Sequence, residues 1–276
     1  MNKPKVSVIT VVYNDVNNIE LTIKNVLKQT YSNLEYIVID GASSDGTLDV
    51  IKKYTDSIVW HSEPDQGIYD AMQKGAQLAS GEWILYRNCG DFFATPSAIE
   101  DLFSSYDKDE GEDFLIADIR YFKEFGYKDF KPSILTKSYL ESMPVFHPST
   151  FVRRSTQLRY PFHLEYRYSA DYCFFVESFL NGAKYRYFDI LLSLYNNETG
   201  ASTDSFDKSL KDNIDFLLKF GVYDSSHIKR LKYKMWKCII NKKIKRYFPF
   251  YSWYHKKHLK DMGWIECDLN TVLKNI

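Results

Sequence analysis

A regular alternation of strand-like and helix-like segments in the first hundred residues restricts this chain to one broad class of fold. Residues Val6–Tyr13 form a continuous run rich in β-branched side chains, which is typical of a strand buried on both faces. Further segments predict strands at Leu34–Ile39, Ile58–His61 and Trp83–Tyr86 and helices at Asn18–Gln29, Thr47–Tyr54 and Ile68–Ala79. Strands and helices that alternate with short connections indicate an α/β fold with a mostly parallel central sheet and flanking helices.

The carboxyl ends of the predicted strands are where a ligand is expected, because ligands bind beyond these ends in parallel sheets. Acidic or amide side chains follow each of the four strands, at Tyr13–Asn14, Asp40–Asp45, Glu63–Gly67 and Asn88–Asp91. Taken alone, the sequence of the loop after the second strand (DGASSDGT) favours a turn and helix cap, with Ser44 or Asp45 as the capping residue. It matches neither the GxGxxG fingerprint nor the P-loop.

The later parts of the chain have a different character. The region 114–200 is aromatic-rich and predicts strands at Phe114–Tyr121 and Lys184–Phe188 and a helix at Asp171–Leu180. From Phe206 the pattern becomes helical and basic. Residues 206–276 hold 16 basic and 7 acidic side chains, a net charge of +9, whereas residues 1–205 hold 20 and 29, a net charge of −9. We therefore expect the two parts to have different roles.

Composition excludes several classes of protein. With 276 residues, 45% of them hydrophobic and 26% charged, the chain is expected to be globular and soluble. No apolar run approaches the length of a membrane-spanning helix, and the run at the N-terminus predicts no cleavable signal peptide. The four cysteines are far apart and form no CxxC pair, so we expect a reducing cytoplasm and neither a disulfide framework nor a structural zinc site.

The basic C-terminal part contains an unusual stretch at Ile228–Lys260. Its 33 residues include 12 Lys or Arg, eight aromatic residues and no Asp or Glu. Such a mixture suits contact with a membrane that carries anionic headgroups, and it equally suits a helical subdomain whose aromatic side chains pack on the rest of the protein. Nucleic acid is disfavoured as a partner because the rest of the chain is acidic and has no nucleic-acid-binding motif.

Four segments resemble, in order and spacing, the family 2 glycosyltransferases with the GT-A fold: VSVITVVYN, IVIDGASSDGT, EPDQGIYDAMQKG and GEWILYRNCGD. The resemblance is strong over residues 5–95 and weaker over residues 147–151 and 169–202. The most similar branch includes many enzymes of bacterial surface-polysaccharide assembly. The resemblance implies a GT-A domain at residues 1–205, with a nucleotide-sugar half at about 1–95 and an acceptor half at about 96–205, followed by a helical basic-aromatic extension at 206–276.

The resemblance also implies roles for individual residues. The nucleotide-sugar site would include Val11, Tyr13, Asn14, Asp40, Asp45, Asp65, Gly67, Asn88, Gly90, Asp91 and His147. Asp91 would bind a divalent metal, Mn²⁺ or Mg²⁺, which is the kind of cation that carboxylate oxygens hold. Two departures from the family pattern bear on this site. Asn88 and Gly90 stand where many relatives have further carboxylates, and Gly41 replaces a second Asp that reads uracil.

The catalytic base is expected later in the chain. Asp171 matches an acidic residue that opens a helix in the relatives and deprotonates the acceptor hydroxyl. One base opposite the leaving diphosphate gives direct displacement with inversion of configuration. The alternative interpretation of Asp171 is a helix N-cap.

These inferences favour an inverting glycosyltransferase. The donor would be a nucleotide-diphosphate sugar, with a UDP-sugar expected, and the acceptor a lipid-linked oligosaccharide, such as one on a polyprenyl diphosphate at the inner face of the cytoplasmic membrane. Three alternatives remain open at this point: an inactive scaffold subunit, suggested by the depleted metal motif, a nucleotidyltransferase, and a glycoside hydrolase. The third has no supporting pattern of carboxylates.

Overall fold

The computed structural model describes residues 3–123, 126–135, 143–196, 205–221, 225–247 and 263–266. The strands are β1 Val6–Val12, β2 Leu34–Asp40, β3 Val59–Ser62, β4 Trp83–Tyr86, β5 Phe92–Phe93, β6 Phe114–Lys123, β7 Gly126–Phe130, β8 Thr150–Arg153, β9 Tyr185–Asn196 and β10 Ile265–Glu266. The helices are α1 Ile19–Leu27, α2 Thr47–Lys52, α3 Ile68–Leu78, α4 Ala98–Ser105, α5 Arg154–Arg159, α6 Ala170–Leu180, α8 Phe206–Lys219 and α9 Ser225–Tyr247. Residues 198–202, the last part of the weaker family resemblance, and the tail residues 248–260 lie outside the described residues.

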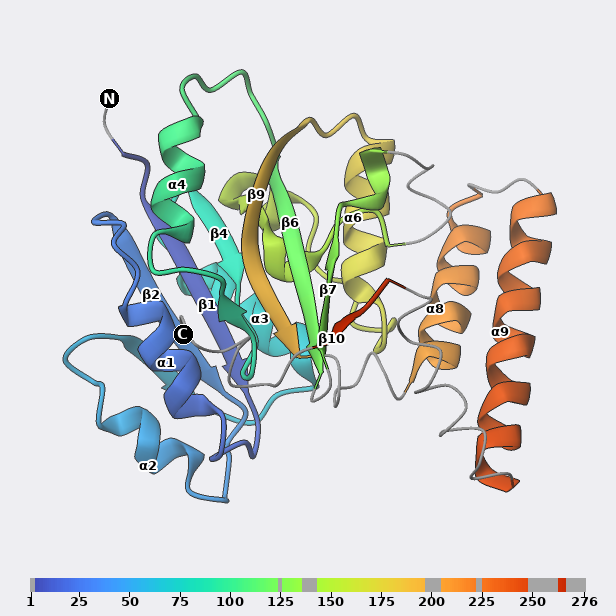
Figure 1. Ribbon diagram of the computed structural model, residues 1–276, viewed down its shortest axis with the longest axis horizontal. Coiled ribbons are helices and arrows are strands. Elements are labelled where there is room, and N and C mark those ends of the chain that lie inside the picture. The colour runs from blue at the N-terminus through green and yellow to red at the C-terminus, as the bar shows by residue number, and fades with distance from the viewer. Residues whose placement is uncertain are drawn as a thin grey trace.

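One continuous sheet forms the centre of the molecule, in the order β10-β7-β6-β8-β4-β1-β2-β3 (Figure 1). β1 pairs in parallel with β2 on one side and with β4 on the other, and β3 extends the parallel part beyond β2. Beyond β4 the sheet is mixed, because β8 runs antiparallel to both β4 and β6 while β9 is parallel to β6. The predicted α/β fold is confirmed, and its parallel part is the segment that the sequence predicted.

Helices cover both faces of the sheet and create two hydrophobic cores. On one face, α1, α2 and α4 pack against side chains such as Val6 and Val8. On the other, α3 packs against β1, and the core cluster that contains Ile9 and Val11 continues through α6 to α8 and α9. Successive residues of a strand point to opposite faces, so β1, whose seven residues are all buried, contributes side chains to both cores at once. This explains why its sequence does not alternate between buried and exposed residue types.

Two local features differ from the sequence-based expectation. Gly46, rather than Ser44 or Asp45, occupies the N-cap position of α2, with φ of 100°, a conformation that suits glycine. Strand β9 continues to Asn196, eight residues beyond its predicted end at Phe188, because it pairs along the length of β6. That extension brings the end of β9 to the carboxyl ends of the parallel strands, where ligands are expected.

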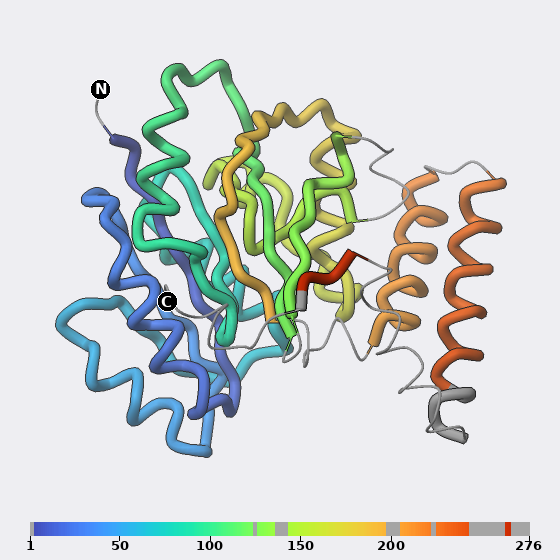
Figure 2. Tube along the Cα trace, viewed as in Figure 1, coloured from blue at the N-terminus to red at the C-terminus, as the bar shows by residue number. Residues whose placement is uncertain are grey.

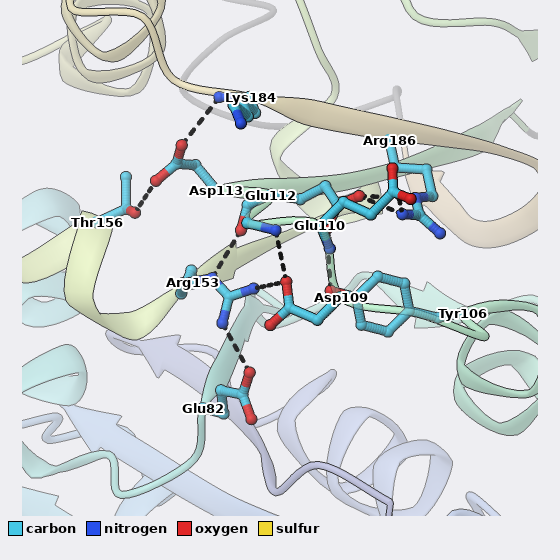
Figure 3. Close-up of polar contacts among 11 residues, drawn as sticks. Glu82, Tyr106, Asp109, Glu110, Glu112, Asp113, Arg153, Thr156, Lys184 and Arg186 are labelled. Carbon is cyan, nitrogen blue, oxygen red and sulfur yellow. Dashed lines mark hydrogen bonds and ion pairs between the residues drawn. The ribbon is translucent and has the colours of Figure 1, made fainter. Parts of the chain in front are cut away.

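An ion-pair network stabilises the sheet at the strand ends that lie away from the expected ligand site (Figure 3). Arg153, at the end of β8, donates to Glu82 over 2.7 Å, to Asp109 over 2.8 Å and to the carbonyl of Glu112 over 2.6 Å. Arg186, near the start of β9, bonds the carboxylate of Glu112. The network therefore joins the loops that precede β4 and β6 to β8 and β9, and it stabilises the sheet away from the candidate site.

The C-terminal helices are part of the same packed unit. Side chains of α8 and α9, including Leu217 and Leu231, belong to the core cluster that contains Ile9 and Phe174. α8 and α9 lie side by side at one end of the molecule, and β10 pairs antiparallel with β7, to which it lies adjacent in Figure 2. The extension predicted from residue 206 is thus helical over α8 and α9 and also supplies an edge strand. Among the residues that the structure describes, no helix combines the length and the apolarity that crossing a bilayer requires.

Close packing of α3 on the sheet yields a first prediction. A Cβ on Gly75 would lie 2.5 Å from Cγ2 of Ile9 and 3.3 Å from Cγ1 of Ile39. An ordinary Gly→Ala change inside a helix stabilises it by about 1 kcal/mol. Here we expect Gly75→Ala to lower the free energy of unfolding by about 1–3 kcal/mol, because the methyl group overpacks the core. Urea denaturation of both proteins measures this.

The double variant Ile9→Ala/Gly75→Ala is the control. It removes the Ile9 methyl group that the new Cβ at position 75 would meet, so its loss of stability should be smaller than the sum of the two single losses. Unchanged or increased stability of Gly75→Ala would contradict the packing argument.

Candidate active site

A cavity of about 610 Å³ lies at the carboxyl ends of β1 and β4. Its walls come from the loop after β1, the start of α3, the loop after β4, the 3₁₀ turn His147–Ser149, the start of α6, the end of β9, and the helices α8 and α9. Four predicted site residues line this one cavity: Asn88, Gly90, Asp91 and His147, together with the predicted base Asp171. Residues separated by more than eighty positions in the sequence therefore meet at one place.

Asp171 lies in the first turn of α6, and the N-cap position belongs to Ser169. Its Oδ1 accepts hydrogen bonds from the hydroxyl of Tyr69, over 2.8 Å, and from the backbone N–H of Tyr172, over 2.9 Å. The side chain remains 23% exposed, and it lines the cavity. Both of these bonds go to one oxygen, which holds the carboxylate in a fixed orientation and leaves Oδ2 toward His147. A carboxylate held in this way can accept a proton from a hydroxyl in the cavity.

His147 lies beside Asp171, with 3.9 Å between Nδ1 and Oδ2 of the carboxylate. The imidazole is buried among aromatic rings, with its centroid 4.8 Å from that of Tyr86. Burial lowers the pKa of His147 to about 4, against the opposing effect of the Asp171 charge. The ring is therefore neutral near pH 7, and its Nε2 is a buried atom without a hydrogen-bond partner.

Asp91 follows β4 and is 4% exposed. Burial raises the pKa of Asp91 to about 7, while the charge of Arg87 and a backbone N–H of Asn196 act in the opposite direction. Its Oδ2 has no hydrogen-bond partner, and neither has Oδ1 of Asn88. Both residues line the same cavity, and buried oxygens without partners are suitable ligands for a hard cation.

Arg87 is a fully buried cation that sequence reasoning did not assign to the site. Its guanidinium donates to the carbonyl of Phe92 over 3.1 Å and to Oγ of Ser193 over 3.0 Å. It also lies over the ring of Phe93, 4.0 Å from its centroid. Burial lowers the pKa of Arg87 to about 10, so the group is charged at neutral pH. Its bonds fix the turn that carries Asp91.

The residues expected to flank a nucleoside form a second group next to this cavity. Asp40 is buried at the end of β2, and its Oδ2 accepts from Oγ of Ser62 over 2.6 Å, while Oδ1 has no partner. Asp65 accepts the N–H of Gly67 over 2.8 Å. A Cβ on Gly41 would lie 2.5 Å from Oδ2 of Asp65. The carboxylate of Asp65 therefore occupies the place that a side chain at position 41 would take.

Other predicted site residues shape the loops. Asn14 has φ of 49° and accepts the N–H of Ser44 over 2.8 Å, which joins the loop after β1 to the loop after β2. Asp45 joins the same loops through Val16 and Thr47. These two residues and Val11, which is buried in β1, are positioned as supports of the site, and direct contact between them and a nucleotide stays a prediction. Tyr13 is 66% exposed and lies beside Gly41. Gly67 and Gly90 have φ of 119° and 90°.

The sequence-based analysis also missed residues that the fold brings in from a distance. Tyr69 belongs to the segment EPDQGIYDAMQKG, but nothing in the spacing of that segment indicates a bond to Asp171. Arg167 precedes α6, and Lys234 comes from α9. Both cations line the cavity, and Lys234 shows that the C-terminal helices form part of its wall. No local signal could have placed Lys234 there, because its position depends on the packing of α9.

The donor set for a metal is small. Among the described residues, no three His, Cys, Asp or Glu side chains are grouped so that they could hold a metal ion on their own. The unpartnered oxygens of Asp91 and Asn88 fit a cation whose remaining ligands come from a substrate or water. The residues present thus fit a metal that binds together with a phosphate-bearing ligand.

Comparison with known proteins places the chain among glycosyltransferases. Residues 7–175, more than half of the chain, match the sequence model described as "Glycosyl transferase family 2". A PGL/p-HBAD biosynthesis glycosyltransferase of Mycobacterium tuberculosis is 25% identical over 232 residues, which cover 80% of this chain and 88% of that protein.

Solved structures that share the fold include the following two. Staphylococcus aureus TarS in complex with UDP-GlcNAc superposes with a TM-score of 0.63 at 17% identity, covering 82% of this chain and 70% of that one. A mannosyltransferase of Pyrobaculum calidifontis in complex with GDP-Man and Mn²⁺ gives a TM-score of 0.62 at 15% identity, covering 82% and 66%.

The burial of His147 generates a prediction about pH. Unfolded histidine titrates near 6.5, whereas the pKa of His147 is lowered to about 4 in the folded protein. Between about pH 4 and about pH 6.5 the folded state therefore binds fewer protons than the unfolded state at this position, so the contribution of His147 makes stability fall as the pH drops through that window. We expect the ¹⁵N ring signals of His147 to stay those of a neutral imidazole down to about pH 5.

The variant His147→Phe identifies the signal, because its spectrum lacks that one ring while the aromatic packing is kept. Protonation of His147 with a midpoint near 6.5 would show that the ring is hydrated rather than enclosed by Tyr86 and its neighbours.

Proposed function

The chain belongs to glycosyltransferase family 2 and is a glycosyltransferase, and we propose that it transfers a sugar, with inversion of configuration, from a nucleotide-diphosphate sugar to an acceptor hydroxyl. The observation that carries the proposal is a single oriented carboxylate, Asp171, in the same cavity as the unpartnered oxygens of Asp91 and Asn88. One base and one site for a leaving diphosphate are the parts that direct displacement requires.

In the proposed reaction, Asp171 takes the proton of the acceptor hydroxyl as the hydroxyl oxygen forms its bond to the anomeric carbon. The bond from that carbon to the diphosphate breaks at the same time, and the nucleoside diphosphate leaves with the electron pair. Tyr69 keeps the carboxylate in place through its 2.8 Å hydrogen bond. The neutral ring of His147 closes one side of the base and adds no positive charge beside the carboxylate, which would make it a weaker proton acceptor.

We propose Asp91 and Asn88 as the residues that hold a divalent cation together with the donor diphosphate. Such a cation, Mn²⁺ or Mg²⁺, neutralises the charge that develops on a leaving diphosphate. The raised pKa of Asp91, about 7, supports this role, because a carboxyl that is costly to ionise alone is stabilised as a carboxylate by a nearby cation. The mannosyltransferase of P. calidifontis holds Mn²⁺ with its nucleotide sugar, which also supports the proposal.

A UDP-sugar is the proposed donor. In the related family pattern a second Asp after the one matching Asp40 reads uracil, and here Gly41 stands at that place. The carboxylate of Asp65 fills the space above Gly41, so a carboxylate is still present beside Asp40 and Tyr13. The complex of TarS with UDP-GlcNAc supports the same donor class.

For the acceptor we propose a lipid-linked oligosaccharide, at the cytoplasmic face of the membrane and in bacterial surface-polysaccharide assembly. Arg167 and Lys234 line the cavity together with residues of α8 and α9, and cations there suit an acceptor that carries phosphate. The name of the mycobacterial relative, a glycosyltransferase of PGL/p-HBAD biosynthesis, supports a role in building a glycoconjugate.

The alternative is a binding or scaffold subunit that has lost activity, which the small donor set for a metal would suit. A nucleotidyltransferase is disfavoured, because the loop after β1, Tyr13-Asn14-Asp15, is not a glycine-rich basic loop.

The base assignment is tested by Asp171→Asn. We expect the turnover number to fall by about 10²–10⁴-fold, because the amide cannot accept the hydroxyl proton, while nucleotide affinity stays nearly unchanged. Sugar transfer and nucleotide binding are measured on the same preparations. Asp215→Asn, a change at an exposed acidic residue of α8, is the matched control and should keep both properties. Full transfer activity in Asp171→Asn would remove this residue as the base.

Donor binding is tested with UDP, GDP, CDP and dTDP, each with and without Mn²⁺, by calorimetry. We expect Mn²⁺-dependent binding with a preference for UDP. Asp91→Ala should weaken the metal-dependent binding by about tenfold or more, because it removes a cation ligand. Asp215→Ala serves as control. Metal dependence that survives in Asp91→Ala would assign the metal to other groups, and no binding of any nucleotide would favour the scaffold alternative.

A further inference from the structure

The outer face of α9 carries two large aromatic side chains that the fold leaves in contact with solvent. Tyr233 is 60% exposed and Trp236 is 58% exposed, and their rings stack with centroids 6.0 Å apart and an interplanar angle of 29°. On a helix surface, residues three apart are neighbours, so Tyr233 and Trp236 form one apolar ridge.

The opposite face of the same helix accounts for the packing. Ile228 and Leu231 are buried in the core cluster that α9 shares with α8, and Met235 packs against that cluster. Because each residue advances about 100° around the helix, Tyr233 and Trp236 lie on a different side of α9 from Leu231 and Met235. These two aromatic residues are therefore not the ones that attach α9 to the rest of the protein, and their exposure needs another explanation.

Cations surround the aromatic ridge. Lys229, Lys232 and Lys237 are exposed on this side of α9, and no acidic side chain in the described part of the chain pairs with any of these three. The helix Ser225–Tyr247 contains no Asp or Glu at all. An uncompensated row of lysines next to Trp and Tyr is suited to a surface that is negative outside and apolar beneath, since the rings reach the boundary of the acyl chains while the lysines meet the headgroups.

From these observations we infer that the outer face of α9, defined by Lys229, Lys232, Tyr233, Trp236 and Lys237, docks on the surface of an anionic lipid bilayer. The same helix lines the active-site cavity through Leu231 and Lys234, so docking would bring the cavity next to the membrane. The inference extends the proposed function, on which its meaning for the acceptor rests, but the binding itself does not depend on sugar transfer.

Single-stranded nucleic acid is a less suitable partner for this surface. It also binds aromatic and basic residues, but residues 1–205 carry a net charge of −9 and would repel it along most of the molecule. A bilayer contacts one helix only, so it meets the basic part of the chain while the acidic part stays in solution.

Sedimentation with vesicles tests the docking surface on the full chain. We expect the protein to bind vesicles of phosphatidylcholine that contain about one third phosphatidylglycerol and to bind pure phosphatidylcholine weakly. Binding should fall between about 0.1 M and about 0.5 M NaCl, because salt screens the lysines. The triple variant Lys229→Gln/Lys232→Gln/Lys237→Gln should lower the partition coefficient by about a hundredfold. The variant Tyr233→Gln/Trp236→Gln should lower it at least about tenfold.

Matched controls change the same residue types on other faces. Lys52→Gln/Lys53→Gln alters exposed lysines at the end of α2, and Tyr185→Gln alters an aromatic residue that is 40% exposed at the start of β9. Both should bind vesicles as the unchanged protein does. Circular dichroism and Mn²⁺-dependent binding of UDP on every variant show whether the fold and donor site are intact.

Three outcomes would overturn the docking surface: no binding to anionic vesicles, equal binding of the α9 variants and the unchanged protein, or aromatic-dependent binding of a single-stranded oligonucleotide in the absence of vesicle binding. Vesicle binding without any nucleotide binding would support the docking surface and remove the proposed function. Nucleotide binding without vesicle binding would support the proposed function and remove the docking surface.

Discussion

The structure depends on the burial of β1 on both faces while it pairs in parallel with a strand on each side. Val12 lies opposite Asp40 of β2, and Ile9 lies opposite Tyr86 of β4, so the loops after three strands leave the sheet at the same edge. A slip of one residue would exchange the side chains of the two cores, so packing fixes the register. The positions of Asp40 and Asp91 are therefore set by the hydrophobic cores beneath them, and the loop hydrogen bonds only refine those positions.

This dependence explains which parts could be predicted from the sequence. The elements from β1 to β4 were predicted within a few residues, because apolar runs, helical periodicity and Gly or Asp breaks are local signals. The approach of Tyr69 to Asp171, 102 residues later, is not local. Neither is the antiparallel insertion of β8 between β4 and β6, which turns a parallel sheet into a mixed one. The order of the motifs indicated which side chains meet at the site. Only the fold could indicate which contacts orient those side chains.

The turn after β4 carries an electrostatic cost, because it buries a carboxyl group that is incompletely hydrogen-bonded. Arg87 and Asp91 are both buried, but the bonds of the guanidinium go to Phe92 and Ser193, and one oxygen of Asp91 keeps no partner. A buried carboxyl in this state is disfavoured as an anion, as its raised pKa indicates, and an uncompensated polar atom costs stability. A protein can retain such an unfavourable arrangement when packing holds the surrounding chain in place. Here the hydrogen bonds of Arg87 to Phe92 and Ser193 hold the turn in place. The buried carboxyl of Asp91 is therefore suited to a cation that binds only together with the donor.

The place of α9 connects the site to the docking surface in a way that bears on the acceptor. A helix with its side chains is about 10 Å across, so the cavity wall at Leu231 and the outer ridge at Trp236 are separated by about one helix diameter. If the ridge rests on a bilayer, the part of the cavity wall that α9 supplies lies about that far above the lipid surface. A glycan on a lipid anchor extends from the surface over a distance of this kind, so the place of α9 suits the proposed lipid-linked acceptor.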